Sequence, residues 1–298
     1  MDQVYLNLYS PVTIAKSKLN DLHLTTEREE YDHNFVFEVR PLTSDRVELV
    51  PFIPSQHAVP LLHMHLQEPT IKRWLGMDFC TLEDVGEWVE KTIRQEPSAM
   101  FFAIYSDAPG SHKPTPRKEW EFAGVIALIN VHKADMIAEP GYIQIAKPYQ
   151  RTHVLTHAVG LILHHILDSP IVMTSYRPEV IEAGGCLDIS MDGAGKKELG
   201  VTKKTLSGSL GLRRCQWFTN SLNDKSRAAA LRLGFTFEGL IRNHRLLPDG
   251  KEGSRDPRPD SYNPNTRGRD SWLASIIWED WEGADGKRAH IDSLMSRR

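Results

Sequence analysis

One carboxylate stands beside a turn that could bind an anion. Glu139 lies at the head of an apolar, strand-like segment, 141–146, which passes through a proline turn into a strongly apolar helical pattern at about 152–167. The N–H groups at the start of a helix lack intrahelical partners and, with the helix dipole behind them, favour anions such as a pyrophosphate. The segment therefore predicts a carboxylate near an anion site, although many strand–helix turns bind nothing.

Two later segments carry further polar groups with chemical potential. Asn223 and Ser226 begin an amphipathic helical pattern that stops at a glycine and is followed by a strand-like segment. Arg269 and Asp270 come immediately before the last strand-like segment. Each segment is a weak signal when taken alone, because Asn and Ser are also ordinary helix caps. Their order along the chain is the stronger observation.

That ordered set resembles the GNAT acetyltransferase superfamily, and within it the RimJ/RimL-like branch. The resemblance covers roughly residues 40–282. The motifs that carry it are Glu139-Pro-Gly-Tyr142, Thr156-His-Ala158, Asn223-Asp-Lys-Ser226, Leu233-Gly-Phe-Thr-Phe-Glu-Gly-Leu-Ile-Arg242 and Arg269-Asp270. The resemblance implies an α/β GNAT fold, in which a single mixed sheet of about seven strands is splayed at a cofactor cleft and flanked by helices.

The resemblance also implies acetyl-CoA as cosubstrate and assigns residues to it. The strand that includes Ile143 and Ile145 would hydrogen-bond the pantetheine. Asn223 and Ser226 would face the thiol end of the cofactor. The main chain of the loop and first helical turn would hold the pyrophosphate, through Gln150, Arg151, Thr152, His153, Val154, Leu155 and Thr156.

Some positions depart from the superfamily's pattern. His153 and Leu155 stand where glycines usually allow the backbone to approach the phosphates. The guanidinium of Arg151 could compensate by contacting a phosphate directly. His157 replaces a glutamate of the branch, and Ala230 replaces the tyrosine that many members use as general acid.

The predicted function is transfer of an acetyl group from acetyl-CoA to a primary amine, by direct attack in a ternary complex. An alkylammonium near pKa ~10 must first lose a proton, and Glu139 is the candidate general base. Ser226 is a candidate to protonate or hydrogen-bond the leaving sulfur. A salt-bridged Glu139 and a helix-capping Ser226 are the structural alternatives. A catalytically silent GNAT-like module, binding acyl-CoA or a protein partner, is the alternative function.

The histidines and cysteines favour no metal site. His153, His157 and His164 fall on one helical face, but the glutamate of a His-Glu-x-x-His zinc motif is missing. We expect them to line the polar side of the helix. Cys215 lies in an apolar strand and reads as structural, since no Cys–His pattern accompanies it. The expected acceptor is a small-molecule amine or a protein N-terminus.

Composition limits the surroundings in which the protein acts. The net charge of −3 gives no case for nucleic acid or an anionic membrane as partner. Three widely spaced cysteines indicate a reducing compartment, and no apolar run is long enough to span a membrane. We therefore predict a cytoplasmic monomer or homodimer.

The chain is expected to form an N-terminal extension, 1–38, and one domain, 39–298, with insertions at about 169–210 and 248–269. Alternating apolar residues and 3.6-residue periodicities mark the elements. The expected strands are 36–49, 100–105, 122–131, 141–146, 212–219, 235–247 and 272–278, and the expected helices are 56–75, 82–93, 152–167, 225–233 and 285–296.

Overall fold

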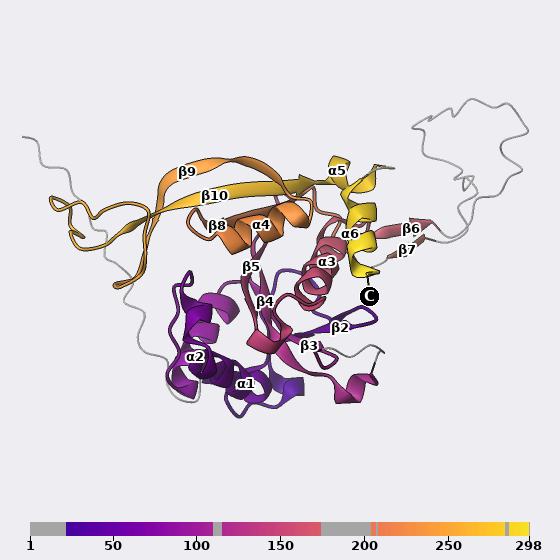
Figure 1. Cartoon of the computed structure of the whole chain (residues 1–298). Coiled ribbons are helices and arrows are strands. Elements are labelled where there is room, and N and C mark those ends of the chain that lie inside the picture. Colours follow the sequence, from indigo (N-terminus) through magenta and orange to yellow (C-terminus); the bar gives the residue numbers. More distant parts are fainter. Residues whose placement is uncertain (1–21, 110–114, 174–203, 207, 284–285, 298) are drawn as a thin grey trace, which may run out of the picture.

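A mixed sheet of eight strands organises the molecule (Figure 1). The computed structural model describes residues 22–109, 115–173, 204–206, 208–283 and 286–297. The strand order is β1-β2-β3-β4-β5-β8-β10-β9, and only the β5–β8 pair is parallel. The strands are β1 Leu42–Thr43, β2 Val47–Pro51, β3 Met100–Ser106, β4 Glu121–His132, β5 Ile137–Ile145, β8 Arg214–Asn220, β9 Thr236–Leu246 and β10 Gly268–Ile277.

Helices cover both faces of this sheet. The helices are α1 Pro54–Gln67, α2 Leu82–Val89, α3 Val154–Leu167, α4 Asp224–Arg232, α5 Trp278–Glu282 and α6 Lys287–Met295. One core lies between the sheet and α1 and α2, and a second lies between the sheet and α3, α4 and α6. Along β3, Phe101 and Ala103 face the first core, while Met100, Phe102 and Ile104 face the second. This is the two-residue alternation of a strand buried on both sides.

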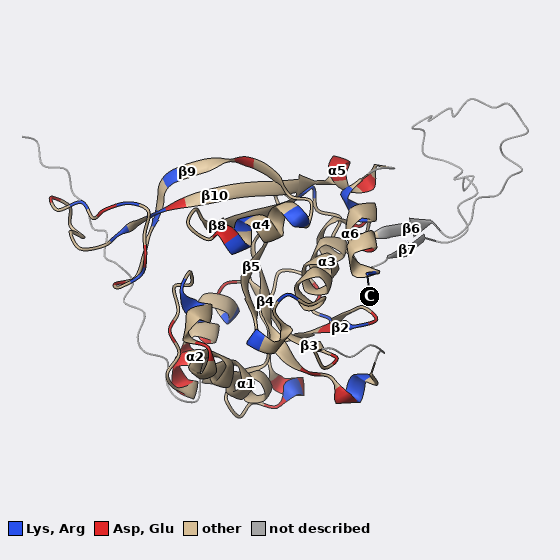
Figure 2. Cartoon of the chain, viewed as in Figure 1, with Lys and Arg blue, Asp and Glu red and all other residues tan. Residues whose placement is uncertain are grey.

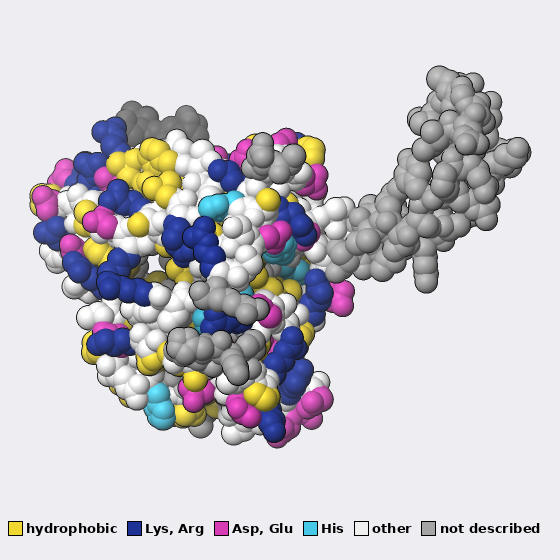
Figure 3. Space-filling view, turned by 45° about the vertical axis from the view of Figure 1, so that its right-hand side comes forward, with side chains coloured by type: hydrophobic (Ala, Val, Ile, Leu, Met, Phe, Trp, Pro, Cys, Tyr) yellow, Lys and Arg dark blue, Asp and Glu magenta, His cyan; other side chains and the backbone are white. Residues whose placement is uncertain are grey.

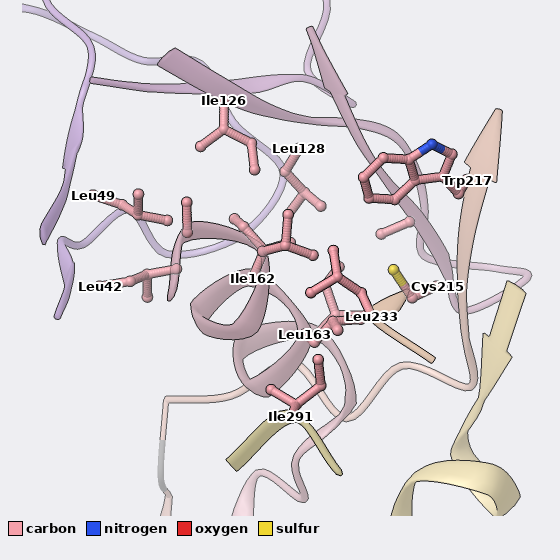
Figure 4. Close-up of a cluster of buried hydrophobic side chains, with 14 of the residues drawn as sticks. Leu42, Leu49, Ile126, Leu128, Ile162, Leu163, Cys215, Trp217, Leu233 and Ile291 are labelled. Atoms are coloured by element: carbon pink, nitrogen blue, oxygen red, sulfur yellow. The ribbon is translucent and has the colours of Figure 1, made fainter. Parts of the chain in front are cut away.

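The second core is built around α3. Ile162 and Leu163 of this helix are fully buried: Ile162 points toward Leu128 of the sheet, and Leu163 lies beside Leu233 and Ile291 (Figure 4). α3 lies inside this core because it is hydrophobic nearly all round, and such a helix must be buried. α3 therefore fixes the position of the turn that precedes it.

The predicted strand over residues 36–49 was wrong. The chain forms two short strands there, β1 and β2, joined by a turn in which Ser44 Oγ accepts the N–H of Val47 at 3.0 Å. The segment before β1 is irregular, and its apolar side chains pack on the second core instead. A serine that competes for backbone hydrogen bonds ends the strand, and apolar alternation alone did not indicate this.

Other helix and strand boundaries differ from the predicted ones by a few residues. The helix expected over 56–75 ends at Gln67, because Pro69 follows and continues only as a 3-10 turn. Thr81 caps α2 and forms a capping box with Asp84. β5 and β10 each begin four residues before their predicted starts, at 137 and 268.

The expected extension and insertions are partly described. Leu22 and Tyr31 are buried, so the described end of the extension packs against the domain. The first insertion contributes a small hairpin, β6 Ile171–Met173 with β7 Lys204–Leu206, and its residues 174–203 lie outside the described part. No helix among the described residues is long and apolar enough to cross a membrane.

The dependence of the fold on α3 gives a stability prediction. Ile162→Ala should lower the free energy of unfolding by about 2–5 kcal/mol, because it leaves a cavity in a dry, close-packed core. Leu66→Ala, at a position of α1 that is 56% exposed, should change it by less than about 0.5 kcal/mol. Urea denaturation of both variants measures the difference. Equal effects would mean that α3 does not anchor the sheet.

Candidate active site

A large cleft opens where the only parallel strand pair comes apart. β5 and β8 pair at just two positions, Ile137–Arg214 and Ala138–Cys215, and then diverge. The cleft has a volume of about 1750 Å³ and runs along β5 from Glu139 to Ile145. Because β5 no longer pairs with β8 beyond Ala138, its main-chain groups on that side are available to a ligand. This donor set suits an extended chain of amides such as pantetheine.

Glu139 lies at the apex of the fork that β5 and β8 form where they diverge. Its side chain is only 5% exposed, and its carboxylate accepts a hydrogen bond from Asn130 Nδ2 at 2.8 Å. It also accepts the backbone N–H of Phe218, on the far side of the fork. Asn130 has a left-handed φ of 51° at a register shift between β4 and β5. The carboxylate therefore bridges three strands at the point where the ladder stops.

The surroundings of Glu139 alter its proton affinity. Burial raises the pKa of Glu139 to about 7, against the opposing hydrogen bonds from Asn130 and Phe218 and the charges of Arg269 and Arg245. A carboxyl group with a pKa near neutrality can hold or release a proton at working pH. Within the described structure no Lys, Arg or His side chain lies within salt-bridge distance of Glu139, so the alternative of a salt-bridged Glu139 is not found.

A bulge in β5 faces the same space. Tyr142 has a left-handed φ of 47°, and the pairing of β4 with β5 shifts around it. Its ring meets Trp88 edge-on at a centroid distance of 4.9 Å. Unpaired main-chain groups at a bulge are free to bind a ligand. Both aromatic residues line the cleft opposite β8.

The start of α3 closes one end of the cleft. Gln150 and Leu155 line it, as do Ile143 and Ile145 of β5. The Nε2 of Gln150 donates to the Ile145 carbonyl at 2.9 Å, which fixes the turn between strand and helix. The amides of the first turn of α3 lack partners within the helix, as in an anion site.

Side chains of the same loop point elsewhere. The His153 Nε2 atom lies 2.9 Å from Ser106 Oγ and 3.0 Å from an Asp107 carboxylate oxygen, and Val154 is fully buried. Thr152 Oγ1 donates to the Tyr149 carbonyl, and Thr156 Oγ1 accepts from Arg232. Only the main chain of this loop can therefore serve a phosphate, with the exposed Arg151 as the side chain that remains available.

The start of α4 borders the cleft on the β8 side. Asn223 Oδ1 accepts the N–H of Ser226 at 3.2 Å, so Asn223 is a helix cap. Ser226 Oγ accepts the indole N–H of Trp217 at 3.0 Å. This bond orients the hydroxyl and leaves its own proton for donation. Ala230 is fully buried, so this position of α4 offers no acid.

The second expected insertion bends back over the cleft. Arg73 donates to Glu252 through Nε at 3.1 Å and Nη2 at 2.6 Å, and Lys251 Nζ donates to the Lys72 carbonyl at 2.9 Å. These bonds tie the loop between β9 and β10 to the segment after α1. Figure 3 shows a hollow on this side of the molecule, with Lys and Arg side chains around it. The loop between β9 and β10 thus closes one side of the cleft.

The histidines of α3 are used in packing. His157 Nδ1 lies 2.9 Å from Ser44 Oγ, and His164 lies between Asp168 and Asp292 at 2.9 Å from each. Throughout the described residues, no cluster of three or more His, Cys, Asp or Glu side chains could hold a metal ion. Cys215 is fully buried, and burial raises the pKa of its thiol above the ordinary range.

Sequence reasoning missed several groups around Glu139. Asn130 and the N–H of Phe218 reach it from neighbouring strands, and no spacing in the sequence indicates such contacts. Arg245 and His244 of β9 also line the cleft. Arg269 was part of a quoted motif, and its place in the cleft could have been inferred from that motif.

Comparisons with known proteins agree on the fold. A family model described as an acetyltransferase (GNAT) domain matches residues 46–236. A GCN5-related N-acetyltransferase from Brucella melitensis has 20% identity and a TM-score of 0.59, over 87% of this chain and 86% of that one. RimJ from Mycobacterium smegmatis, in complex with CoA-disulfide, has 19% identity and a TM-score of 0.53, over 86% and 93%.

A third solved structure is an acetyltransferase from Salmonella typhimurium that modifies the N-terminal serine of a 50S ribosomal subunit protein. It has 14% identity and a TM-score of 0.50, over 80% of this chain and 99% of that one. No curated protein sequence matches the chain. The solved structures share the fold at low identity, whereas the family model covers more than half of the chain. The parted parallel strands and the matched family model agree: the protein belongs to the GNAT acetyltransferase family.

Proposed function

We propose that the protein transfers the acetyl group of acetyl-CoA to a primary amine by direct attack in a ternary complex. The observation that carries the proposal is the buried Glu139, with its pKa raised to about 7, at the apex of a cleft long enough for the cofactor. The acceptor is a small-molecule amine or a protein N-terminus, the latter being the substrate named for the Salmonella relative of the same fold. A cytoplasmic location remains a prediction from the sequence.

The residues divide the reaction between them. Glu139 takes a proton from the acceptor ammonium, directly or through water, and the amine nitrogen then attacks the thioester carbon. Formation of the C–N bond gives a tetrahedral oxyanion, and its collapse breaks the C–S bond so that the thiolate leaves with the electron pair. The remaining proton that the amide nitrogen must lose passes to this sulfur, directly or through Ser226. Ser226 Oγ–H is placed to hydrogen-bond or protonate that sulfur, because Trp217 holds the hydroxyl by its oxygen. Main-chain N–H groups at the Tyr142 bulge are available to the oxyanion.

A silent acyl-CoA-binding module is the second candidate. The capping role of Asn223, the buried Ala230 and the side chains at His153 and Leu155 all favour it. Glu139 argues against it, because burying a carboxyl group lowers stability, and a module that only binds acyl-CoA has no need of such a group at the apex of the cleft. Cofactor binding and turnover must therefore be measured separately.

Acetyl-CoA binding is the first measurement. We expect calorimetry to detect binding to the whole chain, and Asn223→Ala/Ser226→Ala to weaken it about tenfold through loss of the α4 cap and its cleft contacts. Ser293→Ala on α6 is the matched control and should bind like the unaltered protein. Absence of binding by the folded, unaltered chain would remove the premise of both candidate functions.

Turnover tests the role of Glu139. Glu139→Gln should lower kcat at least about a hundredfold with the affinity for acetyl-CoA unchanged. In the unaltered enzyme kcat/KM should rise with pH through an apparent pKa of about 7, and this limb should vanish in the variant. Glu96→Gln, at an exposed cleft position, should keep the profile. Thiol release measures all three, and an unchanged profile in Glu139→Gln would assign the base elsewhere.

The same carboxyl should make stability depend on pH. In the folded protein the pKa of Glu139 is about 7, above the ordinary glutamate value of 4.5. The folded state therefore binds the proton more tightly than the unfolded state, and the free energy of unfolding falls as pH rises between these two values. Glu139→Gln should match the unaltered protein at pH ~4.5 and exceed it by about 3 kcal/mol above pH ~7.5. Urea denaturation of both proteins at the two pH values gives the difference. A constant difference would mean that Glu139 is not desolvated.

A further inference from the structure

Two arginines face each other across the acceptor wall of the cleft. Arg269 of β10 stands directly opposite Arg245 of β9 in the antiparallel register, and both side chains line the cleft. Like charges at directly opposed positions of a sheet destabilise it. Figure 2 shows basic residues on the arm formed by β9, β10 and their loop. Such a pair is stable only if another group offsets the repulsion.

No ion pair with a protein carboxylate supplies that offset, although the buried Glu139 acts on both arginines from beyond salt-bridge distance. Arg269 Nε donates to Ser271 Oγ at 3.0 Å, but among the described residues no acid lies within salt-bridge distance of Arg269 or Arg245. The other two arginines of the cleft are ion-paired, Arg73 with Glu252 and Arg227 with Asp224. The unpaired state is therefore a property of this wall and not of the whole cleft.

Arg269 is also partly removed from water. Its side chain is half-buried, and burial lowers the pKa of Arg269, while the charge of Glu139 opposes this shift and the charge of Arg245 adds to it. Next to it, His244 is half-buried, and its Nδ1 atom has no partner within the described structure. Burial and the two arginines lower the pKa of His244, so it is a neutral neighbour that adds no counter-charge. A half-buried guanidinium that stands opposite a second one and forms no ion pair with a protein acid favours an anionic ligand.

The position of the pair identifies that ligand as the acceptor. Both arginines act electrostatically on Glu139, at the apex of the fork. The anion-binding turn at the start of α3 lies beyond the other end of β5, six residues away at Ile145. Six residues of extended strand span about 20 Å. The pair therefore lies beside the proton-accepting carboxylate, far from the turn suited to the pyrophosphate.

We infer that the acceptor carries a carboxylate close to its primary amine, and that Arg269, with Arg245, binds this carboxylate while Glu139 faces the amine. The inference rests on the proposed acetyl transfer and narrows its substrate class. The carboxylate is either the α-carboxylate of a free amino acid or an acidic side chain next to a peptide N-terminus. Both sources offer the same planar anion to a guanidinium fork.

Matched acceptor pairs test the inference. One pair is an amino acid and its carboxamide, and the other is an amidated tripeptide with aspartate or asparagine at its second position. We expect kcat/KM to be at least about tenfold higher for the carboxylate member of one pair, the size of a charge-assisted hydrogen bond. The pair that responds identifies the source of the carboxylate. Equal values within both pairs would overturn the inference.

Arginine variants test which side chains produce the preference for a carboxylate acceptor. Arg269→Gln should abolish the preference, and Arg245→Gln should reduce it, with the Kd of acetyl-CoA unchanged in both. Arg258→Gln is the matched control, because Arg258 lies in the same β9–β10 loop, is exposed and pairs with Asp260. A weaker Kd for acetyl-CoA in Arg269→Gln, together with an unchanged preference, would assign the arginine to a cofactor phosphate and overturn the inference.

A product-binding experiment separates this inference from the proposed function. The N-acetylated forms of the same four compounds are products, so their binding needs no turnover. The carboxylate products should raise Tm and the amide products should not, and Arg269→Gln should lose the difference. Product binding without any acetyl transfer would refute the proposed function and retain the anion site. A Tm that no carboxylate product changes would refute the anion site.

Discussion

The parting of β5 from β8 is the constraint on which the rest of the site depends. Two parallel strands that stay paired satisfy each other's main-chain groups and leave no room for a ligand. Here the pairing stops after Ala138, and a carboxylate enters the gap and accepts the N–H of Phe218 that the ladder would have used. The same side chain thus occupies the end of the ladder, and the burial that raises its pKa follows from that position.

The rigid parts of the fold keep this gap open. The two faces of the sheet are covered by separate cores, one under α1 and α2 and the other around α3. Close-packed cores deform little, so the strands cannot simply close on each other. The hydrogen bonds of Glu252 and Lys251 join the β9–β10 arm to the segment after α1. This side of the cleft is therefore bounded by residues that lie 179 positions apart in the chain.

Much of the architecture could be predicted from local sequence. Period-two and 3.6-residue patterns located every long strand and helix of the main domain, and Thr81 marked the start of α2 through its capping chemistry. Errors occurred where a short-range competitor decided the outcome. Ser44 divided one expected strand into two, and Pro69 ended a helix whose apolar pattern continued. In both cases one residue changed the backbone hydrogen bonding without altering the hydrophobic pattern.

The sequence by itself determined the family and the order of the elements and marked Glu139 as the candidate base, because these depend on residue types at short spacings. Only the tertiary structure decided what Glu139 contacts and how burial raises its pKa. It also decided that the side chains of His153 and Thr156 turn away from the cleft, and that Arg269 meets Arg245. The surroundings of Glu139 and the Arg269–Arg245 pair depend on register between strands, which a one-residue slip would reverse. The side chains of His153 and Thr156 are oriented by contacts of the start of α3 with other elements, which local sequence does not encode.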